Sequence, residues 1–242
     1  MRRILLIVLR MFGPFFVLRL MWNAKHLSKE ENFEYLQKSA KRAIKVGRVI
    51  PHYYGIENIP KEPGFVYFPN HQGMFDVMMF LASSPHPFSF VMKKELANVP
   101  LLKQVAECSG SLAMDRENMR QSLGVIQEMA KRVSNKENFL IFAEGTRNRN
   151  KNIMGNMKPG AFKCAVRAHA PIVPCVLIDS YLPFDTKLLR KVHVEVHYLP
   201  PIYYEEYQDM KTVDIAAMVQ ERITRKIEEV ENARKCENGI DK

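Results

Sequence analysis

The sequence predicts an α/β fold: a central, mostly parallel sheet flanked by helices, preceded by an N-terminal membrane-binding helical segment. Three observations lead to this prediction. Residues 4–22 form the most hydrophobic stretch of the chain. From residue 48 onward, short runs rich in β-branched and aromatic residues alternate with stretches of helical periodicity, which is typical of a parallel sheet covered by helices. Two polar motifs directly follow two of the apolar runs.

The hydrophobic stretch at residues 4–22 is interrupted by Arg10, by Arg19 and by the pair Gly13-Pro14. A membrane-spanning helix needs about 20 mainly apolar residues, and a signal peptide needs an unbroken apolar run before a cleavage site of small residues. Two short helices bent at Gly13-Pro14 fit the pattern better, because basic residues seven positions apart share a helical face and can reach lipid headgroups. We expect residues 1–27 to lie in one leaflet, with a spanning helix as the alternative, and residues 28–242 to form one domain.

Within that domain we expect strands at residues 65–68, 88–92, 111–114, 139–142, 172–177 and 192–198. Helices are expected near residues 77–83, 117–133, 161–168 and 213–235. Apolar residues recur at three- and four-residue steps in the second helix and predict one buried face there, made of Leu123, Ile126, Met129, Ala130 and Val133. No internal repeat or linker divides the domain.

The formal charge of +10 indicates an anionic partner, such as nucleic acid, an acidic membrane surface or a phosphorylated ligand. The basic residues are spread along the chain, and no helix-turn-helix, zinc-finger or aromatic RNA-binding motif is visible, so we expect no nucleic-acid partner. The four cysteines lack metal-ligand spacing. We interpret Cys108, Cys164 and Cys175 as small core residues in a reducing environment, and we expect no metal and no other cofactor.

The first polar motif is Asn-His-Gln-Gly-Met-Phe-Asp at residues 70–76. His71 is the candidate general base, because an imidazole ordinarily titrates near neutral pH, and Asp76 can fix the tautomer and orientation of its ring. At about 100° per residue, a regular helix would separate the two side chains by roughly 140°. The pair therefore requires His71 in a turn and Asp76 in the first turns of the next helix. The alternative is a turn histidine with Asp76 as a helix cap.

The second polar motif is Phe-Ala-Glu-Gly-Thr-Arg-Asn-Arg at residues 142–149. Arg147 and Arg149 can each make paired contacts with a phosphate. Glu144 can bond a substrate hydroxyl or hold an arginine in place, and Gly145 and Thr146 complete the substrate-binding loop. The alternative is a surface turn with a salt bridge, which contributes little to stability.

Three further basic residues follow other expected strands: Arg116 comes after residues 111–114, and Lys93 and Lys94 come after residues 88–92. Each can add a contact to an anion, although each alone also fits a surface ion pair. Because ligands bind at the carboxyl ends of the strands in open α/β sheets, we expect all of these loops to meet in one crevice.

In these residues the chain resembles the membrane-associated glycerophospholipid acyltransferases, specifically those acting on 1-acyl-glycerol-3-phosphate. The resemblance lies in four ordered blocks, which bracket somewhat less than half of the chain: residues 70–76, 110–116, 142–149 and 172–174. It implies a glycerolipid acyltransferase-like α/β fold for residues 28–242. In the His-x-x-x-x-Asp motif it implies that His71 is the base and Asp76 its orienter. It also implies that Arg116 and Arg147 bind the phosphate, with Glu144 alongside them.

The resemblance further implies transfer of an acyl group to the 2-hydroxyl of lysophosphatidate, which forms phosphatidic acid in phospholipid biosynthesis. The histidine would activate the substrate hydroxyl directly, without an acyl-enzyme. The co-substrate would be an acyl thioester of coenzyme A or of acyl carrier protein, and the carrier protein is then a candidate partner. The expected location is the cytoplasmic face of the cell membrane, monotopic or peripheral, on the lipid surface.

The chain departs from the family pattern at three positions of the second motif. Ala143, Asn148 and Asn150 stand where the family usually has proline, serine and glycine. None of these removes a charge, so they bear on acceptor selectivity more than on activity. Glycerol 3-phosphate or another lysolipid is the alternative acceptor. A non-catalytic basic membrane-binding protein is the remote alternative.

Overall fold

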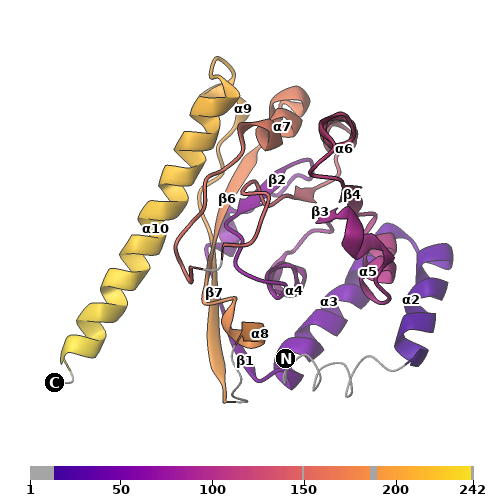
Figure 1. The fold of residues 1–242 in the computed structure, drawn as a ribbon, viewed down its shortest axis with the longest axis horizontal. Coiled ribbons are helices and arrows are strands. Elements are labelled where there is room, and N and C mark those ends of the chain that lie inside the picture. The colour runs from indigo at the N-terminus through magenta and orange to yellow at the C-terminus, as the bar shows by residue number, and fades with distance from the viewer. Residues whose placement is uncertain (1–13, 149, 186–189, 241–242) are drawn as a thin grey trace.

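The structure is a computed structural model that describes residues 14–148, 150–185 and 190–240. Its centre is a seven-stranded sheet in the order β1-β7-β6-β2-β5-β3-β4 (Figure 1). Neighbouring strands are parallel except β6 and β7, which are antiparallel. The predicted α/β fold with a mostly parallel sheet is therefore confirmed. The strands are β1 (Val49–Tyr54), β2 (Val66–Pro69), β3 (Ser89–Lys93), β4 (Leu112–Met114), β5 (Phe139–Leu140), β6 (Ile172–Ile178) and β7 (Val192–Tyr198).

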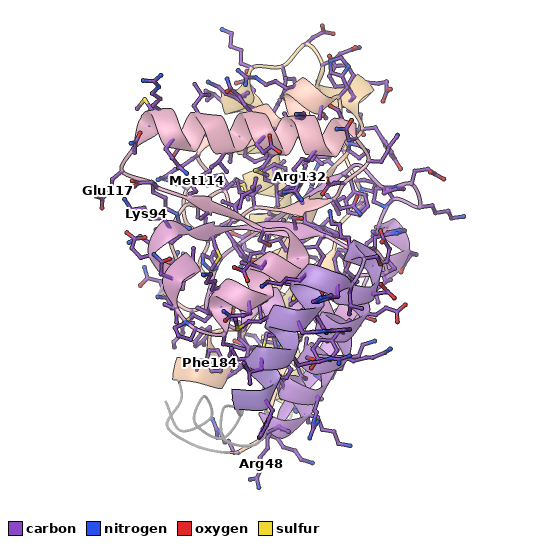
Figure 2. The ribbon with its side chains drawn as sticks, turned by 90° about the vertical axis from the view of Figure 1, so that its right-hand side faces the viewer. Arg48, Lys94, Met114, Glu117, Arg132 and Phe184 are labelled. Carbon is purple, nitrogen blue, oxygen red and sulfur yellow. The ribbon has the colours of Figure 1, made fainter. Side chains whose placement is uncertain are left out.

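Helices cover both faces of this sheet (Figures 1 and 2). On one side lie α2 (Pro14–His26), α3 (Lys29–Val46), α4 (Asp76–Ser83) and α5 (Leu102–Ser109). On the other lie α6 (Met119–Ser134), α7 (Lys163–Ala168) and α10 (Thr212–Ile240). Shorter helices complete the fold: the 3-10 helices η1 (Ile56–Asn58), η2 (Lys94–Asn98) and η3 (Pro159–Phe162), and α8 (Leu182–Asp185) and α9 (Tyr204–Tyr207).

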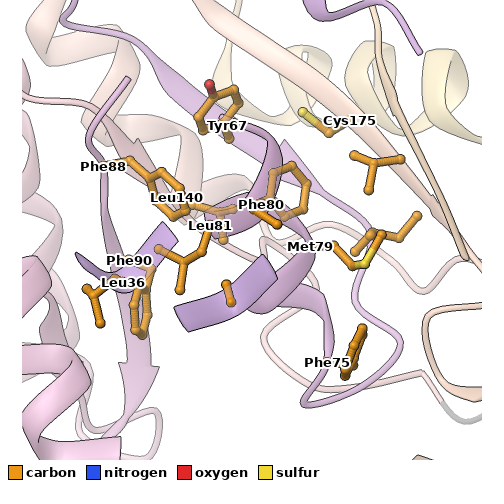
Figure 3. Packing of buried hydrophobic residues seen from close by; sticks show 14 of the residues in the cluster. Leu36, Tyr67, Phe75, Met79, Phe80, Leu81, Phe88, Phe90, Leu140 and Cys175 are labelled. Carbon is orange, nitrogen blue, oxygen red and sulfur yellow. The ribbon is translucent and has the colours of Figure 1, made fainter. Parts of the chain in front are cut away.

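The central strand β2 sends side chains into both layers of the core. Val66 and Phe68 belong to the cluster under α6, α7 and α10, whereas Tyr67 points to the cluster under α3 and α4, as expected from the two-residue period of a strand. Figure 3 shows Tyr67 in this second cluster beside Phe80 of α4 and Phe88. A strand that is buried on both faces has a continuous apolar sequence, and this is why β2 could be predicted from the sequence.

Most predicted elements occur where the sequence placed them, with two corrections. β5 ends at Leu140, two residues before the predicted end, because the chain turns there into the second motif. Leu123 does not belong to the buried face of α6, since 41% of it is exposed at the open end of that helix. The remaining residues of the predicted face are buried: Ile126, Met129, Ala130 and Val133.

The sequence prediction missed β1, α3 and α5. The signal for α3 was present: the Ser28 side chain accepts a hydrogen bond from the Glu31 amide at 3.2 Å, and the Glu31 carboxylate accepts one from the Ser28 amide at 2.8 Å. This capping box marks a helix start. β1 is an edge strand whose pattern of burial is weak, so its sequence carries no clear alternation.

The second helix predicted for the N-terminal segment is confirmed as α2, which begins at Pro14. The first predicted helix and the bend before Pro14 lie outside the described residues. Leu20 of α2 is fully buried against the domain, whereas the opposite side of the helix exposes four large apolar side chains: Phe15, Leu18, Met21 and Trp22. Among the residues that the structure describes, no helix is long and apolar enough to cross a membrane.

The three cysteines expected in the core are buried, and none forms a disulfide: Cys108, Cys164 and Cys175. Burial raises the pKa of the Cys108 thiol to about 11 and that of Cys164 to about 12, which makes both poor nucleophiles. Over the described ranges, no three His, Cys, Asp or Glu side chains are grouped so that they could hold a metal ion.

Candidate active site

The two polar motifs meet at one edge of the sheet. They follow β2 and β5, which are neighbouring parallel strands, so their carboxyl ends point the same way. The loops are joined directly: the backbone amide of His71 donates to Oε1 of Glu144 at 2.7 Å, and the amide of Asn148 donates to the carbonyl oxygen of His71 at 2.9 Å. The two motif loops that were predicted to meet at the strand ends therefore do meet.

His71 and Asp76 are in contact, in the arrangement that the sequence predicted for such a pair. His71 lies in the turn after β2, and Asp76 is the first residue of α4. Nδ1 of His71 lies 2.7 Å from Oδ2 of Asp76, and the carboxylate is fully buried while the histidine side chain keeps 14% of its surface exposed. The alternative, a turn histidine with Asp76 as a cap, accounts for the backbone amides that donate to Asp76 but not for the contact of its carboxylate with the imidazole.

Hydrogen bonds to Asp76 favour one tautomer of His71. Its carboxylate accepts from the backbone amides of Gln72 at 2.7 Å and Gly73 at 3.0 Å, and from the hydroxyl of Ser180 at 2.5 Å. A carboxylate surrounded by donors is an acceptor, so Nδ1 of His71 carries the proton that faces it. Nε2 is left with its lone pair and is the atom able to take a proton from a substrate.

The ring of Phe142 stacks on the imidazole of His71, with centroids 3.9 Å apart and the planes inclined by 21°. Phe142 is buried at the end of the run that begins with β5. Phe142 therefore packs against the face of the imidazole and holds its plane, while Asp76 holds the ring through Nδ1. The sequence prediction included Phe142 in the motif but gave it no role.

Glu144 holds the two loops together. Its Oε1 accepts from the amide of His71 and its Oε2 from the amide of Gly155 at 2.9 Å. A Cβ at Gly155 would lie 2.5 Å from Oε2, so a larger residue there would displace the Glu144 carboxylate. Burial raises the pKa of the Glu144 carboxyl, and the two amide hydrogen bonds oppose this shift. Its hydrogen bonds thus make it a clamp, while the expected contact with a substrate stays a prediction.

Arg116 and Arg147 supply positive charge beside the histidine loop. Burial lowers the pKa of the Arg116 guanidinium, Glu95 raises it and the nearby charge of Arg147 lowers it again. Guanidinium groups make paired hydrogen bonds with phosphate, and the expected binding of phosphate by Arg116 and Arg147 stays a prediction. Arg149 lies outside the described residues. Thr146 is exposed, and Gly145 has φ of +70°, a conformation that favours glycine.

Lys93 and Lys94 follow β3 as expected, but both are exposed and engaged in ion pairs. Nζ of Lys93 lies 3.1 Å from Glu95, and Nζ of Lys94 lies 2.5 Å from Asp115. Figure 2 shows Lys94 near Met114 and Glu117 at the end of the sheet where α6 begins. Neither lysine lines the cavity beside the second motif, and their binding of substrate stays a prediction.

A cavity of about 320 Å³ opens beside the site, between α6 and the loop after β5. Arg116, Gly145 and Lys158 line its polar part, and Phe142, which stacks on His71, lines its inner wall. Glu117 and Ser122 also line it, and most of the remaining lining is apolar, including Val91, Met114, Leu123, Ile126 and Ile141. A second cavity, of about 390 Å³, lies at the carboxyl end of β7, but none of the motif residues line it. The smaller one therefore belongs to the site.

Several residues of the site escaped sequence reasoning. Asn70 braces β2 against β6 through two hydrogen bonds with the backbone of Leu177, at 3.0 and 2.7 Å. Ser180 follows β6 and bonds Asp76. The same strand-end logic that identified the two motifs could have identified Ser180, because β6 pairs with β2 in parallel.

Comparison with known proteins agrees with this geometry. The family described as Acyltransferase matches residues 50–178, which contain both motifs. A 1-acyl-sn-glycerol-3-phosphate acyltransferase of Escherichia coli is 29% identical over 167 residues, covering 69% of this chain and 68% of that protein. One of Limnanthes douglasii is 28% identical over 165 residues, covering 67% of this chain and 58% of its own. The chain thus spans somewhat more than half the length of the plant relative.

The fold also has a counterpart among solved structures. The crystal structure of the 1-acyl-sn-glycerophosphate acyltransferase from Thermotoga maritima superposes with a TM-score of 0.78, covering 95% of this chain and 96% of that one at 19% sequence identity. At that identity the match concerns the fold alone. Since the family match covers more than half of the sequence and includes the paired histidine and aspartate, this chain belongs to the acyltransferase family.

Proposed function

We propose that this protein transfers an acyl group from an acyl thioester to the 2-hydroxyl of 1-acyl-glycerol-3-phosphate, producing phosphatidate. The observation that carries the proposal is the 2.7 Å contact between His71 and the buried carboxylate of Asp76, next to a cavity that combines Arg116 with an apolar lining. A base, an anion site and an apolar cavity are the parts that acylation of a lysophospholipid requires. The names of the relatives support the same acceptor.

The proposed reaction is a direct transfer. Nε2 of His71 takes the proton of the acceptor hydroxyl as its oxygen attacks the thioester carbonyl carbon. The tetrahedral intermediate then collapses, the carbon–sulfur bond breaks, and the departing thiolate takes the proton from the imidazolium. Asp76 stabilises the positive charge that His71 carries between these steps. The burial of Asp76 and the stacked Phe142 hold the imidazole in one orientation, which converts an encounter into an oriented reaction.

Arg116 and Arg147 are the proposed phosphate ligands of the acceptor. The cavity has a volume within the usual range for small-molecule sites, and its apolar lining suits a hydrocarbon chain. Glycerol 3-phosphate carries the phosphate but no chain, so we favour a lysolipid acceptor. Both coenzyme A and acyl carrier protein are anionic, and the net charge of +10 suits either donor.

We further propose that α2 attaches the protein to the cytoplasmic face of a membrane in a peripheral or monotopic manner. Its exposed apolar side chains include Phe15, 84% exposed, and Trp22, 46% exposed. The guanidinium of Arg19 lies 4.7 Å from the ring centroid of Trp22. Aromatic and basic side chains on one helix are typical of segments that lie at a lipid interface.

The test is thiol release from acyl-coenzyme A and from acyl carrier protein, measured in lipid vesicles with lysophosphatidate, glycerol 3-phosphate or no acceptor. We expect release only with lysophosphatidate, its loss in His71→Ala, and a higher acceptor requirement in Arg147→Ala. Equal release with glycerol 3-phosphate would move the proposal to that acceptor. A folded, vesicle-bound protein that releases no thiol with any pair would overturn the enzymatic proposal in favour of a non-catalytic membrane protein.

A further inference from the structure

The Asp179–Ser180 turn after β6 contacts Asp76, the carboxylate partner of His71. Ser180 is fully buried, and its hydroxyl donates to Oδ1 of Asp76 at 2.5 Å. The backbone amides of Gln72 and Gly73 belong to the same loop as His71. Ser180 is therefore the donor to Asp76 that comes from a different part of the sheet. Its hydrogen bond holds Oδ1 in place relative to β6, while Oδ2 is the oxygen in contact with His71.

The turn that carries Ser180 has an unusual backbone conformation. Asp179 has φ of +63°, in the left-handed region that costs free energy for a residue with a side chain. Such a conformation persists only where surrounding contacts enforce it. The amide of Asp179 donates to Oδ1 of Asn152 at 2.9 Å, and Nδ2 of Asn152 donates to Oδ1 of Asp179 at 3.1 Å.

Asn152 also connects this turn to the histidine loop. Its Oδ1 accepts from Nε2 of Gln72 at 2.9 Å, and Oε1 of Gln72 accepts from the amide of Ser180 at 2.8 Å. Gln72 and Asn152 are both buried. Gly73 completes the packing, since a Cβ there would lie 3.4 Å from the carbonyl oxygen of Ser180. The loop that carries His71 and the turn that carries Ser180 thus share one buried network.

The C-terminal helix α10 fixes the outer side of the turn. Nη1 of Arg234 lies 2.7 Å from Oδ2 of Asp179, and Nη2 lies 2.5 Å from Oε1 of Glu195 on β7. Asn152 donates to Glu231, also on α10, at 3.2 Å. The strained turn is therefore tied to a helix that follows both motifs in the sequence and contributes none of the motif residues.

We propose that Ser180 is a positioning residue for acyl transfer: it lies on a turn whose Asp179 is held by Arg234 of α10, and it orients Asp76 and through it the imidazole of His71. This inference rests on the proposed function, because it assigns a role within the same reaction. The Ser180 hydroxyl lies 2.5 Å from Oδ1 of Asp76 and 3.0 Å from Oε1 of Gln72, and the shorter of the two contacts is the one to the carboxylate. The role of α10 in catalysis is then indirect, through the geometry of the turn.

The decisive variants are Ser180→Ala and Ser180→Cys. Cysteine fills the space of serine but is a weak donor, so it separates hydrogen bonding from packing. We expect kcat to fall about tenfold in both variants, with the KM values of acceptor and thioester unchanged. Ser89→Ala is the matched control, because Ser89 is also fully buried and donates a 2.7 Å hydrogen bond, to Ser109, at the far end of β3. A Cys variant as active as the parent would overturn the proposal.

A second measurement does not depend on activity. In protein with ¹⁵N-labelled histidine rings, the Nδ1 proton of His71 is assigned by its absence in His71→Gln. We expect this signal to shift in Ser180→Ala and Arg234→Met, and to stay in place in Ser89→Ala and Arg234→Lys. An unchanged signal in Ser180→Ala would overturn the positioning role. If the signal shifts as expected in these variants but the parent releases no thiol, the proposed function is refuted and the positioning of His71 is not.

The link to α10 is tested by a double-mutant cycle. If Arg234 acts through Ser180, the combined loss of kcat in Ser180→Ala/Arg234→Met will be smaller than the product of the two separate losses. Independent effects would multiply, and that result would limit the proposal to Ser180 by excluding α10.

Discussion

Glu144 and His71 are joined by a hydrogen bond in which the backbone amide of the base donates to the buried carboxylate at 2.7 Å. The second motif therefore does more than present arginines to an anion. It holds the backbone of the first motif, while the ring of Phe142 from the same segment covers the imidazole. The two loops form one unit, and changes in either should act on the geometry of His71.

Phe142→Ala should reduce kcat about tenfold, because the imidazole loses the ring that fixes its plane, and a 1 Å displacement of a catalytic group has a large effect on rate. Phe142→Tyr keeps the aromatic face and should retain most activity. The measurement is initial-rate thiol release over a range of both substrates. A large rise in KM with kcat unchanged would show that Phe142 contacts substrate and does not orient His71.

Arg116→Met should raise the acceptor concentration needed for half-maximal rate by about 10- to 100-fold, the range expected for lost hydrogen bonds to a charged group. The KM of the thioester should change little. Arg120→Met is the control, since Arg120 is exposed on α6 and outside the cavity. If both variants raise the required acceptor concentration equally, the effect of Arg116→Met comes from a general loss of positive charge.

Leu123→Trp should shift substrate preference toward shorter acyl chains. Leu123 lines the 320 Å³ cavity at the open end of α6, and an indole there reduces the volume available to a hydrocarbon chain. The assay is competition among thioesters and lysolipids of graded chain length. Val213→Trp, on an exposed position of α10, should leave the profile of the parent. An unchanged profile in Leu123→Trp would place the chain elsewhere.

Glu195 should contribute to acid stability. The hydrogen bond from His197 lowers the pKa of Glu195 to about 2 from its ordinary value of 4.5; burial opposes this shift, and Arg234 supports it. Between those values the unfolded chain binds more protons than the folded one, so this contribution to stability is present above pH 4.5 and is lost as the pH falls toward 2. Urea unfolding between pH 2.5 and 6 should show a shallower pH dependence in Glu195→Gln than in the parent.

The exposed Glu205 provides the comparison for that experiment. Glu205→Gln should keep the slope of the parent, because its carboxylate lies in solvent. If Glu195→Gln and the parent lose stability in parallel as the pH falls, other carboxylates account for the acid sensitivity and the Glu195 network contributes nothing to it.

The sequence predicted the parts of this protein that depend on neighbours along the chain. Buried strands read as apolar runs, and the residues that follow β2, β4 and β5 include the proposed base, its proposed orienter and the arginines. It did not predict Ser180 at Asp76, because that contact joins residues 104 positions apart; the position of Ser180 after a strand was a usable signal, but the serine itself indicates no partner. The clamp by Glu144 was missed for a related reason: a glutamate beside arginines predicts a charge contact, whereas its partners here are two backbone amides.

The exposed face of α2 should carry the membrane contact. Replacing Phe15 and Trp22 by serine removes two large apolar side chains, which at about 25 cal/mol per Å² should weaken vesicle binding at least tenfold. The matched control is the double variant Tyr203→Ser/Val213→Ser, which removes exposed apolar side chains from the other side of the domain. Sedimentation with vesicles of graded anionic lipid content measures the binding of both double variants.

Because Arg19 and Lys25 lie on the same helix, binding of the parent should rise with anionic lipid and fall with salt. Equal binding by parent and Phe15→Ser/Trp22→Ser would mean that α2 is not the anchor, and that the contact comes from other parts of the chain.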